Sequence, residues 1–128
     1  MRTKLPTRRI AENFRVQTGQ QRFVCTAGYE YETGNLRELF FNDRGKIGSG
    51  LDDMLYDIGV LCSLALQYGA DGTDLIRSMC KDADGNLASP VGQALEKALI
   101  YEKEHKEALQ KVISPHNLGN DKTSYPTE

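Results

Sequence analysis

The chain has 128 residues, of which 39% are hydrophobic and 27% are charged, so it suits one folded domain and excludes a chain that is disordered throughout. No apolar run approaches the roughly 20 residues of a membrane span, and no apolar stretch follows the basic start, so we expect a cytoplasmic protein without a signal peptide. The three cysteines lie far apart with no C-x-x-C pair, which argues against a disulfide framework or a zinc site.

Positive charge is concentrated at the start of the chain. Residues 1–22 hold six basic residues against Glu12, a net +5, so residues 23–128 must carry −7 of the total −2. The net charge argues against binding to duplex nucleic acid. The part before the first predicted strand, residues 1–9, is called the N-terminal arm. The basic residues of 1–22 together form either a solvated basic segment, or a set of anion-binding side chains, or a segment that docks on an acidic face of a second copy.

Three strands are predicted first along the chain. Residues 10–17 alternate loosely, residues 22–31 are rich in β-branched and aromatic side chains, and residues 36–42 form a third short apolar run. The turns T-G-Q-Q (18–21) and E-T-G-N (32–35) are short enough for hairpins. The three strands therefore predict an antiparallel meander, which needs helices on one face to be stable.

Three helices follow. Ser49 is the expected N-cap of the first helix, with Asp52 completing a capping-box-like pair, and Gly69 suits the position after its end. Between Ile58 and Leu66 the run is apolar except for Gly59 and Ser63. A helix that is apolar all round is buried on all sides. We therefore expect a second subunit to share in covering it.

The second helix is expected over about residues 71–80. Ser89-Pro90 then predicts the start of a third helix that runs to Ile113, roughly 36 Å long. Its charged second half would project or pack on a partner. The sequence thus predicts an α+β fold, a three-stranded antiparallel meander followed by three helices packed on one face of the sheet. Residues 1–113 form a single domain in this prediction, and residues 114–128 a disordered tail.

The loop between the third strand and the first helix is the strongest candidate for a ligand site. Glycines allow close approach of a ligand, helix N-termini favour anions, and basic and hydroxyl side chains are available. The predicted phosphate-binding residues are Arg44, Gly45, Lys46, Gly48 and Ser49. The spacing matches neither the Walker P-loop nor G-x-G-x-x-G. A tight turn that needs small residues explains the same pattern, and Asp52 and Asp53 would oppose an anion placed far along the helix.

The other motifs in the sequence give weaker evidence for a binding or catalytic site. Asp82 and Asp84 resemble the first half of a calcium loop, but no Glu closes it, so a polar turn is preferred and no metal is predicted. No catalytic triad, acid/base pair or activated thiol is visible, so we predict no catalytic residues and no cofactor. Tyr29 and Tyr31 on the second strand are candidates for stacking a nucleotide base, with packing in the sheet as the alternative.

Several separate segments resemble the TSCPD-type domain. The matching features in residues 39–69 are the strand that ends in a phenylalanine pair, G-K-x-G-S from Gly45 to Ser49, and S-L-A-L-Q-Y-G from Ser63 to Gly69. L-P-T-R-R at Leu5 to Arg9 and D-A-D-G-N-L-A-S-P-V-G at Asp82 to Gly92 resemble the free-standing form. The resemblance spans about residues 5–100. The domain also occurs near the C-terminus of adenosylcobalamin-dependent ribonucleotide reductases.

The departures from that family limit what the resemblance implies. The T-S-C-P-D signature and the C-x-x-C tail of the large reductases are absent, as is the reductase barrel. The chain therefore cannot reduce ribonucleotides alone, and no cobalamin site carries over. The resemblance implies a small α+β domain tied to nucleotide metabolism. Free-standing versions resemble bacterial or bacteriophage proteins.

Two functions follow as hypotheses. The first is a non-catalytic, homo-oligomeric nucleotide-binding protein. In it the Gly-rich loop holds a phosphate and Arg8, Arg9 or Arg15 contributes across a subunit interface, and in a phage setting such a protein would sequester a nucleotide signal. The alternative is an accessory protein-interaction domain of a ribonucleotide reductase system, with no small ligand. A small nucleotide-processing enzyme ranks last, because it would need a catalytic cluster assembled from distant residues.

Overall fold

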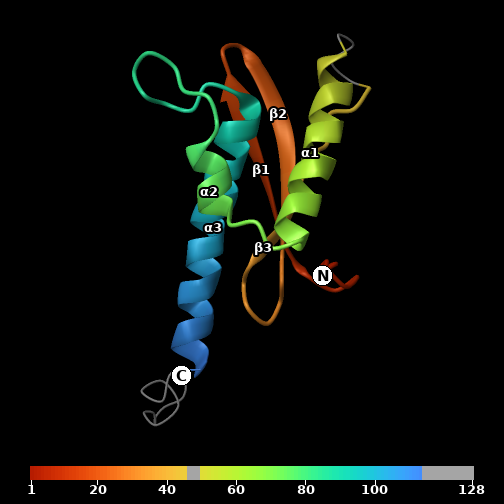
Figure 1. The fold of residues 1–128 in the computed structure, drawn as a ribbon, viewed down its shortest axis with the longest axis vertical. Helices are drawn as coiled ribbons and strands as arrows, with labels where there is room; N and C mark the ends of the chain where they lie inside the picture. The colour runs from red at the N-terminus through yellow and green to blue at the C-terminus, as the bar shows by residue number, and fades with distance from the viewer. Residues whose placement is uncertain (46–49, 114–128) are drawn as a thin grey trace.

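The computed structural model describes residues 1–45 and 50–113, with side chains to residue 111. It contains three strands followed by three helices (Figure 1). In chain order they are β1 (Ile10–Thr18), β2 (Gln21–Tyr29), β3 (Leu36–Phe41), α1 (Leu51–Gln67), α2 (Gly72–Arg77) and α3 (Pro90–Ile113). The α+β prediction is confirmed. The predicted tail and residues 46–49 lie outside the described residues.

The sheet is the predicted meander. Its order is β1-β2-β3, and both pairs are antiparallel, with Phe14 opposite Cys25 and Cys25 opposite Phe41. Gly19 in the first hairpin turn has a φ of 63°, which a residue with a side chain rarely adopts. The three strands thus form one sheet with β1 and β3 at its edges.

The core lies on one face of this sheet. Alternate residues of the strands are buried there, as the two-residue period of a strand requires. They include Phe14 and Val16 of β1, Phe23, Cys25, Ala27 and Tyr29 of β2, and Leu39 and Phe41 of β3. Helix α3 covers this face, and α2 lies beside α3 (Figure 1). Ala94, Leu95 and Ala98 of α3 pack in the core, and Gly72 of α2 lies against Leu99 of α3.

Helix α1 runs along the free edge of β3. The Ser63 hydroxyl accepts a hydrogen bond from the Leu39 N–H (2.9 Å) and donates one to the Leu39 carbonyl (3.1 Å). The Gln67 amide donates to the Arg37 carbonyl (3.3 Å). A Cβ atom on Gly59 would lie 2.9 Å from the Leu39 carbonyl oxygen. The two residues that interrupt the apolar run therefore face β3, where they satisfy its edge groups and allow close approach.

The first residues of the helices differ from the predicted starts at α1 and agree with them at α3. Gly50, with a φ of 82°, is the N-cap of α1 and makes no side-chain cap bond, so the prediction of Ser49 as the N-cap is wrong. The Ser89 hydroxyl accepts from the Gly92 N–H (3.1 Å), and α3 begins at Pro90 as predicted. Helix α2, capped by Asp71, is shorter than expected. No helix within the described ranges is long and apolar enough to cross a membrane.

Candidate functional site

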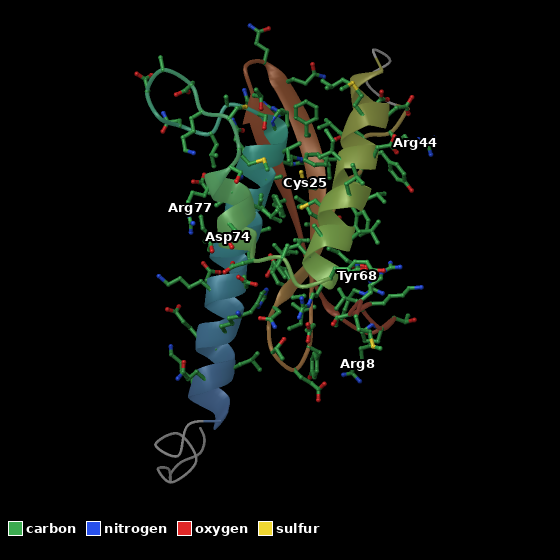
Figure 2. All side chains as sticks on the ribbon, viewed as in Figure 1. Arg8, Cys25, Arg44, Tyr68, Asp74 and Arg77 are labelled. Atoms are coloured by element: carbon green, nitrogen blue, oxygen red, sulfur yellow. The ribbon has the colours of Figure 1, made fainter. Side chains whose placement is uncertain are left out.

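The two groups of predicted phosphate ligands lie at opposite ends of α1. The Thr3 N–H donates to the Gln67 carbonyl (2.7 Å) and the Arg2 guanidinium to the Gln67 side chain (2.6 Å), so the N-terminal arm crosses the C-terminal end of the helix. The Gly-rich loop precedes the N-terminal end. A 17-residue helix is roughly 25 Å long. Figure 2 shows Arg44 and Arg8 near these two ends, so one chain does not unite them.

At the loop end, Arg44 pairs with an aromatic ring. Its guanidinium carbon lies 4.9 Å from the ring centroid of Tyr56, and its Nε lies 3.3 Å from a carboxylate oxygen of Asp53. All three side chains are exposed, so the ion pair is weak and can be exchanged for a ligand. Sequence reasoning missed Tyr56. The available signal was its place three residues after Asp53, on the same face of the helix.

A buried carboxylate already occupies the start of α1. Asp52 is 5% exposed, and its side chain accepts from the Gly45 N–H (2.6 Å) and the Asp53 N–H (3.1 Å). These two amides are therefore not free for a phosphate. Of the predicted phosphate ligands at this end, Arg44 is exposed, and Lys46, Gly48 and Ser49 lie outside the described residues.

At the arm end, Arg8 and Arg9 have different surroundings. Arg9 forms an ion pair with Glu38 and donates to the carbonyls of Pro6 (2.8 Å) and Leu5 (3.2 Å), so it fixes the arm against the sheet. Arg8 is exposed, with its guanidinium carbon 5.6 Å from the ring centroid of Tyr31. Of these two predicted arginines, Arg8 is the one placed to meet a ligand. Arg15 is exposed on β1, away from both groups.

The two predicted base-stacking tyrosines also differ. Tyr29 is fully buried, its hydroxyl donates to the Ala98 carbonyl (2.7 Å), and its ring packs edge-on against His105. Burial raises the Tyr29 pKa above its usual range, so the hydroxyl stays protonated. No face of Tyr29 is open to a base, and its assignment to base stacking is corrected to core packing. Tyr31 is 58% exposed and stays a candidate.

The cysteines differ in exposure. Burial raises the pKa of the Cys25 thiol to about 12 and that of Cys62 to about 11, which disfavours the nucleophilic thiolate. Asp43 adds to the effect at Cys25. Cys80 is exposed. At neutral pH the first two thiols are protonated and act as apolar side chains.

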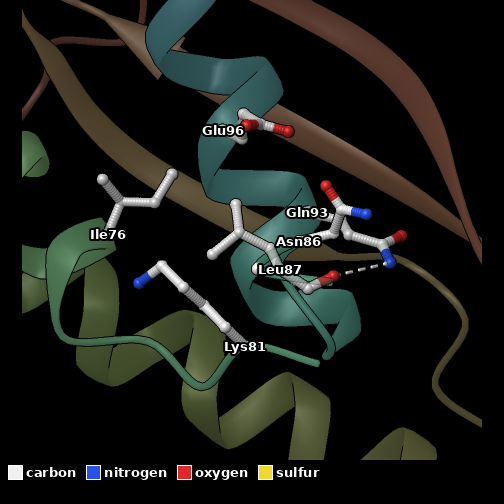
Figure 3. A pocket seen from close by; sticks show the side chains of 7 residues that line it. Ile76, Lys81, Asn86, Leu87, Gln93 and Glu96 are labelled. Carbon is white, nitrogen blue, oxygen red and sulfur yellow. Dashed lines mark hydrogen bonds between the residues drawn. The ribbon is translucent and has the colours of Figure 1, made fainter. Parts of the chain in front are cut away.

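The segment at Asp82 that resembles half of a calcium loop forms a turn closed by its own hydrogen bonds. The Asp82 carboxylate accepts from the N–H groups of Asp84 (2.9 Å) and Asn86 (3.0 Å). Within the described residues no group of three or more His, Cys, Asp or Glu side chains could hold a metal ion. An open hollow of about 490 Å³ lies beside this turn. The Gln93 amide donates to the Leu87 carbonyl there (3.3 Å), and Figure 3 shows the side chains that line the hollow.

The fold and these sites define a small α+β domain whose exposed arginines sit beside aromatic rings at the two ends of one helix. The TSCPD domain model matches residues 1–102, so the chain belongs to the TSCPD domain family. No curated protein and no solved structure matches the chain.

Proposed function

We propose that the protein is a non-catalytic nucleotide-binding protein that works as a homo-oligomer in the cytoplasm. The observation that carries the proposal is the exposed Arg44–Tyr56 pair beside the Gly-rich loop. A guanidinium binds phosphate oxygens with two parallel hydrogen bonds, and an exposed aromatic ring can stack a base. Lys46, Gly48 and Ser49 of the loop would complete the phosphate contacts.

The distance between Arg44 and the N-terminal arm supports an oligomer. Arg8 lies at the far end of α1 from the loop, so it joins the phosphate site only from another copy of the chain. Tyr31 beside Arg8 would come with it as a second stacking ring. A protein that binds a nucleotide without turning it over sequesters that nucleotide, which is the role we propose for it in a bacterial or phage-infected cell.

The first test is whether the protein purified from cells carries a nucleotide, read by absorbance ratio and by mass spectrometry after denaturation. Calorimetry against nucleoside triphosphates and cyclic oligonucleotides follows. Arg44→Ala, Tyr56→Ala and Lys46→Ala should each weaken binding roughly tenfold or more, since each removes a charged or stacking contact.

Arg77→Ala is the matched control. Arg77 lies on α2 in an ion pair with Asp74 at the same 3.3 Å, with similar exposure to Arg44 (Figure 2). Its loss should leave binding unchanged. Absence of binding to every nucleotide tested, or equal binding by the loop variants and the wild type, would overturn the proposal.

The second candidate function is an accessory interaction domain of a ribonucleotide reductase system. It is favoured by large apolar side chains exposed on α1 and by the second half of α3, which extends past the sheet (Figure 1). Here those surfaces would bind protein, and no nucleotide would be needed. A pull-down that recovers reductase subunits, with no nucleotide retained, would favour this function over the first.

A further inference from the structure

Six apolar residues form a continuous line along one side of α1. Three of them are half-buried: Leu51 packs on the core, and Ile58 and Ala65 border a groove toward α2 and α3. The six residues follow one another at alternating steps of three and four residues, the spacing by which helices pair side by side. The other three are the large side chains Met54, Leu61 and Tyr68, which are 61%, 67% and 65% exposed. We call this line the α1 seam: Leu51, Met54, Ile58, Leu61, Ala65 and Tyr68.

The seam is complementary to itself when two copies run in opposite directions. A two-fold axis between Ile58 and Leu61 sets Ile58 of one copy against Leu61 of the other. The same axis sets Met54 against Ala65, a large residue against a small one, and Leu51 against Tyr68. All six positions find an apolar partner, and each contact occurs twice, as a two-fold interface requires.

The charges on α1 select this antiparallel orientation. Its acidic residues, Asp52, Asp53 and Asp57, all lie in the first half of the helix, and residues 58–70 carry no charge. A parallel pair would set Asp53 and Asp57 beside their own copies, without a basic residue on either helix. An antiparallel pair sets them beside the uncharged half and the basic N-terminal arm of the other copy, and it also opposes the two helix dipoles.

An apolar groove lies beside the seam and has room for side chains of a second helix. Ile58, Leu61 and Ala65 form one wall, and residues of α2 and α3 form the other. The groove measures about 210 Å³. Its opposite wall consists of Leu75, Met79, Val91 and Leu95. A second α1 seated on the seam would thus cover apolar surface of three helices.

We propose that two copies of the chain pair antiparallel through the α1 seam, and that this pairing brings the N-terminal arm of each copy, with Arg8, to the Arg44–Tyr56 pair of the other. The second part rests on the proposed nucleotide-binding function. In the pair, the C-terminal end of α1 in one copy lies beside the N-terminal end of α1 in the other. Residues from both copies therefore form one site, although within a single chain they lie at opposite ends of the helix.

The pairing is tested by the mass in solution, from sedimentation velocity at micromolar concentration. The wild type should have the mass of two chains, and Leu61→Asp should have the mass of one chain with an unchanged far-UV circular dichroism spectrum. Ile100→Asp is the matched control, because Ile100 is 53% exposed on α3, outside the seam, and this variant should keep the mass of two chains. A monomeric wild type, or a Leu61→Asp variant with the mass of two chains, would overturn the proposal.

The orientation is tested by disulfide formation between introduced cysteines. In a background with Cys62→Ala and Cys80→Ser, Met54→Cys mixed with Ala65→Cys should give a disulfide-linked pair on mild oxidation. Met54→Cys alone should remain unlinked. Linkage of Met54→Cys to itself would indicate a parallel pair and overturn the antiparallel arrangement.

Nucleotide titration separates failure of the interface from failure of the function. If the seam pairs and the wild type binds no nucleotide, the proposed function fails and the interface stands. If Leu61→Asp is a monomer that binds nucleotide as tightly as the wild type, the function stands and the shared site is overturned. A shared site predicts that Leu61→Asp and Arg8→Ala both lose at least tenfold in affinity.

Discussion

The two faces of α1 differ in exposure and in what they contact. The face toward β3 is buried and holds Gly59, Ser63 and Gln67, whereas the face away from it exposes Met54 and Leu61. In a surface helix the apolar side normally faces the core. The inward face of α1 combines the core residues Leu55 and Leu66 with these small and polar residues. The polar ones are needed because the helix contacts the edge of a strand, whose N–H and C=O groups need hydrogen bonds.

This difference shows that burial within the chain accounts for only one face of α1. The hydrogen bonds of Ser63 and the close approach at Gly59 explain why these two inward residues are not large and apolar. Among the described residues, Met54, Leu61 and Tyr68 stay largely exposed on α1, and an exposed apolar surface of this kind is typical of an interface. Substitutions on the two faces should therefore fail in different ways, by loss of folding on the inward face and by loss of pairing on the outward face.

The largest loss of stability is expected for Gly59→Val. A Cβ atom at Gly59 would lie 2.9 Å from the Leu39 carbonyl oxygen and 3.4 Å from the Phe40 Cα atom, and these backbone atoms of β3 cannot shift easily. The free energy of unfolding should fall by about 3 kcal/mol in urea titrations. The exposed Ala108→Val in α3, which tests helix propensity alone, should lose only about 0.5 kcal/mol. Equal losses in the two variants would contradict the close packing of α1 on β3.

Ser63→Ala should lose less, about 2 kcal/mol. It removes both side-chain hydrogen bonds to Leu39 and leaves the N–H and C=O of a buried edge residue without these partners. Ser78→Ala, at an exposed position after α2, is the control and should change stability by less than about 0.5 kcal/mol. A Ser63→Ala variant as stable as the wild type would show that β3 does not depend on α1 for its edge.

Met54→Ser should have almost no effect on the stability of a single chain. Met54 is largely exposed, so we expect a change within about 0.5 kcal/mol when unfolding is measured at a concentration low enough to separate the copies. Its neighbour Leu55 is buried, and Leu55→Ser should cost about 3 kcal/mol. A large loss in dilute Met54→Ser would mean that the outward face is packed within the chain.

The prediction for the thiols needs no substitution, because it compares the rates at which two native cysteines are alkylated. Burial raises the pKa of Cys62 to about 11, so at pH 8 its thiolate is scarce and alkylation should be much slower than at the exposed Cys80. Raising the pH toward 11 should speed labelling of Cys62 in the folded protein. The folded state holds the thiol neutral, so this group loses its stabilising contribution as the pH rises above about 9. Mass spectrometry of the labelled peptides shows which cysteine is alkylated first. Equal alkylation rates of Cys62 and Cys80 at pH 8 would contradict the burial of Cys62.

The sequence predicted the elements well because their signals are local. Alternation in the strands, glycines in the hairpin turns and Ser89-Pro90 at the start of α3 each depend on neighbouring residues. The orientation of α1 could not be predicted, because the need for Ser63 and Gly59 arises from the edge of β3. The fully apolar pattern indicated burial on all sides and did not say which side the chain itself covers.

The candidate site was predicted less well than the fold for the same reason. Tyr29 and Tyr31 look alike in sequence, but the register of β2 sends Tyr29 into the core and the next turn leaves Tyr31 exposed. Arg8 and Arg9 are adjacent, yet Glu38 holds only Arg9. The separation of the arm from the loop depends on the path of residues 1–9 across the end of α1, which no local pattern encodes.

The most direct test of the central claim, that the outward face of α1 pairs with a second copy, is the dependence of the melting temperature on protein concentration. Pairing of folded chains stabilises them by mass action, so the wild-type melting temperature should rise over a roughly 100-fold increase in concentration. That of Leu61→Asp should stay constant over the same range. A wild-type melting temperature that does not change with concentration would contradict the account.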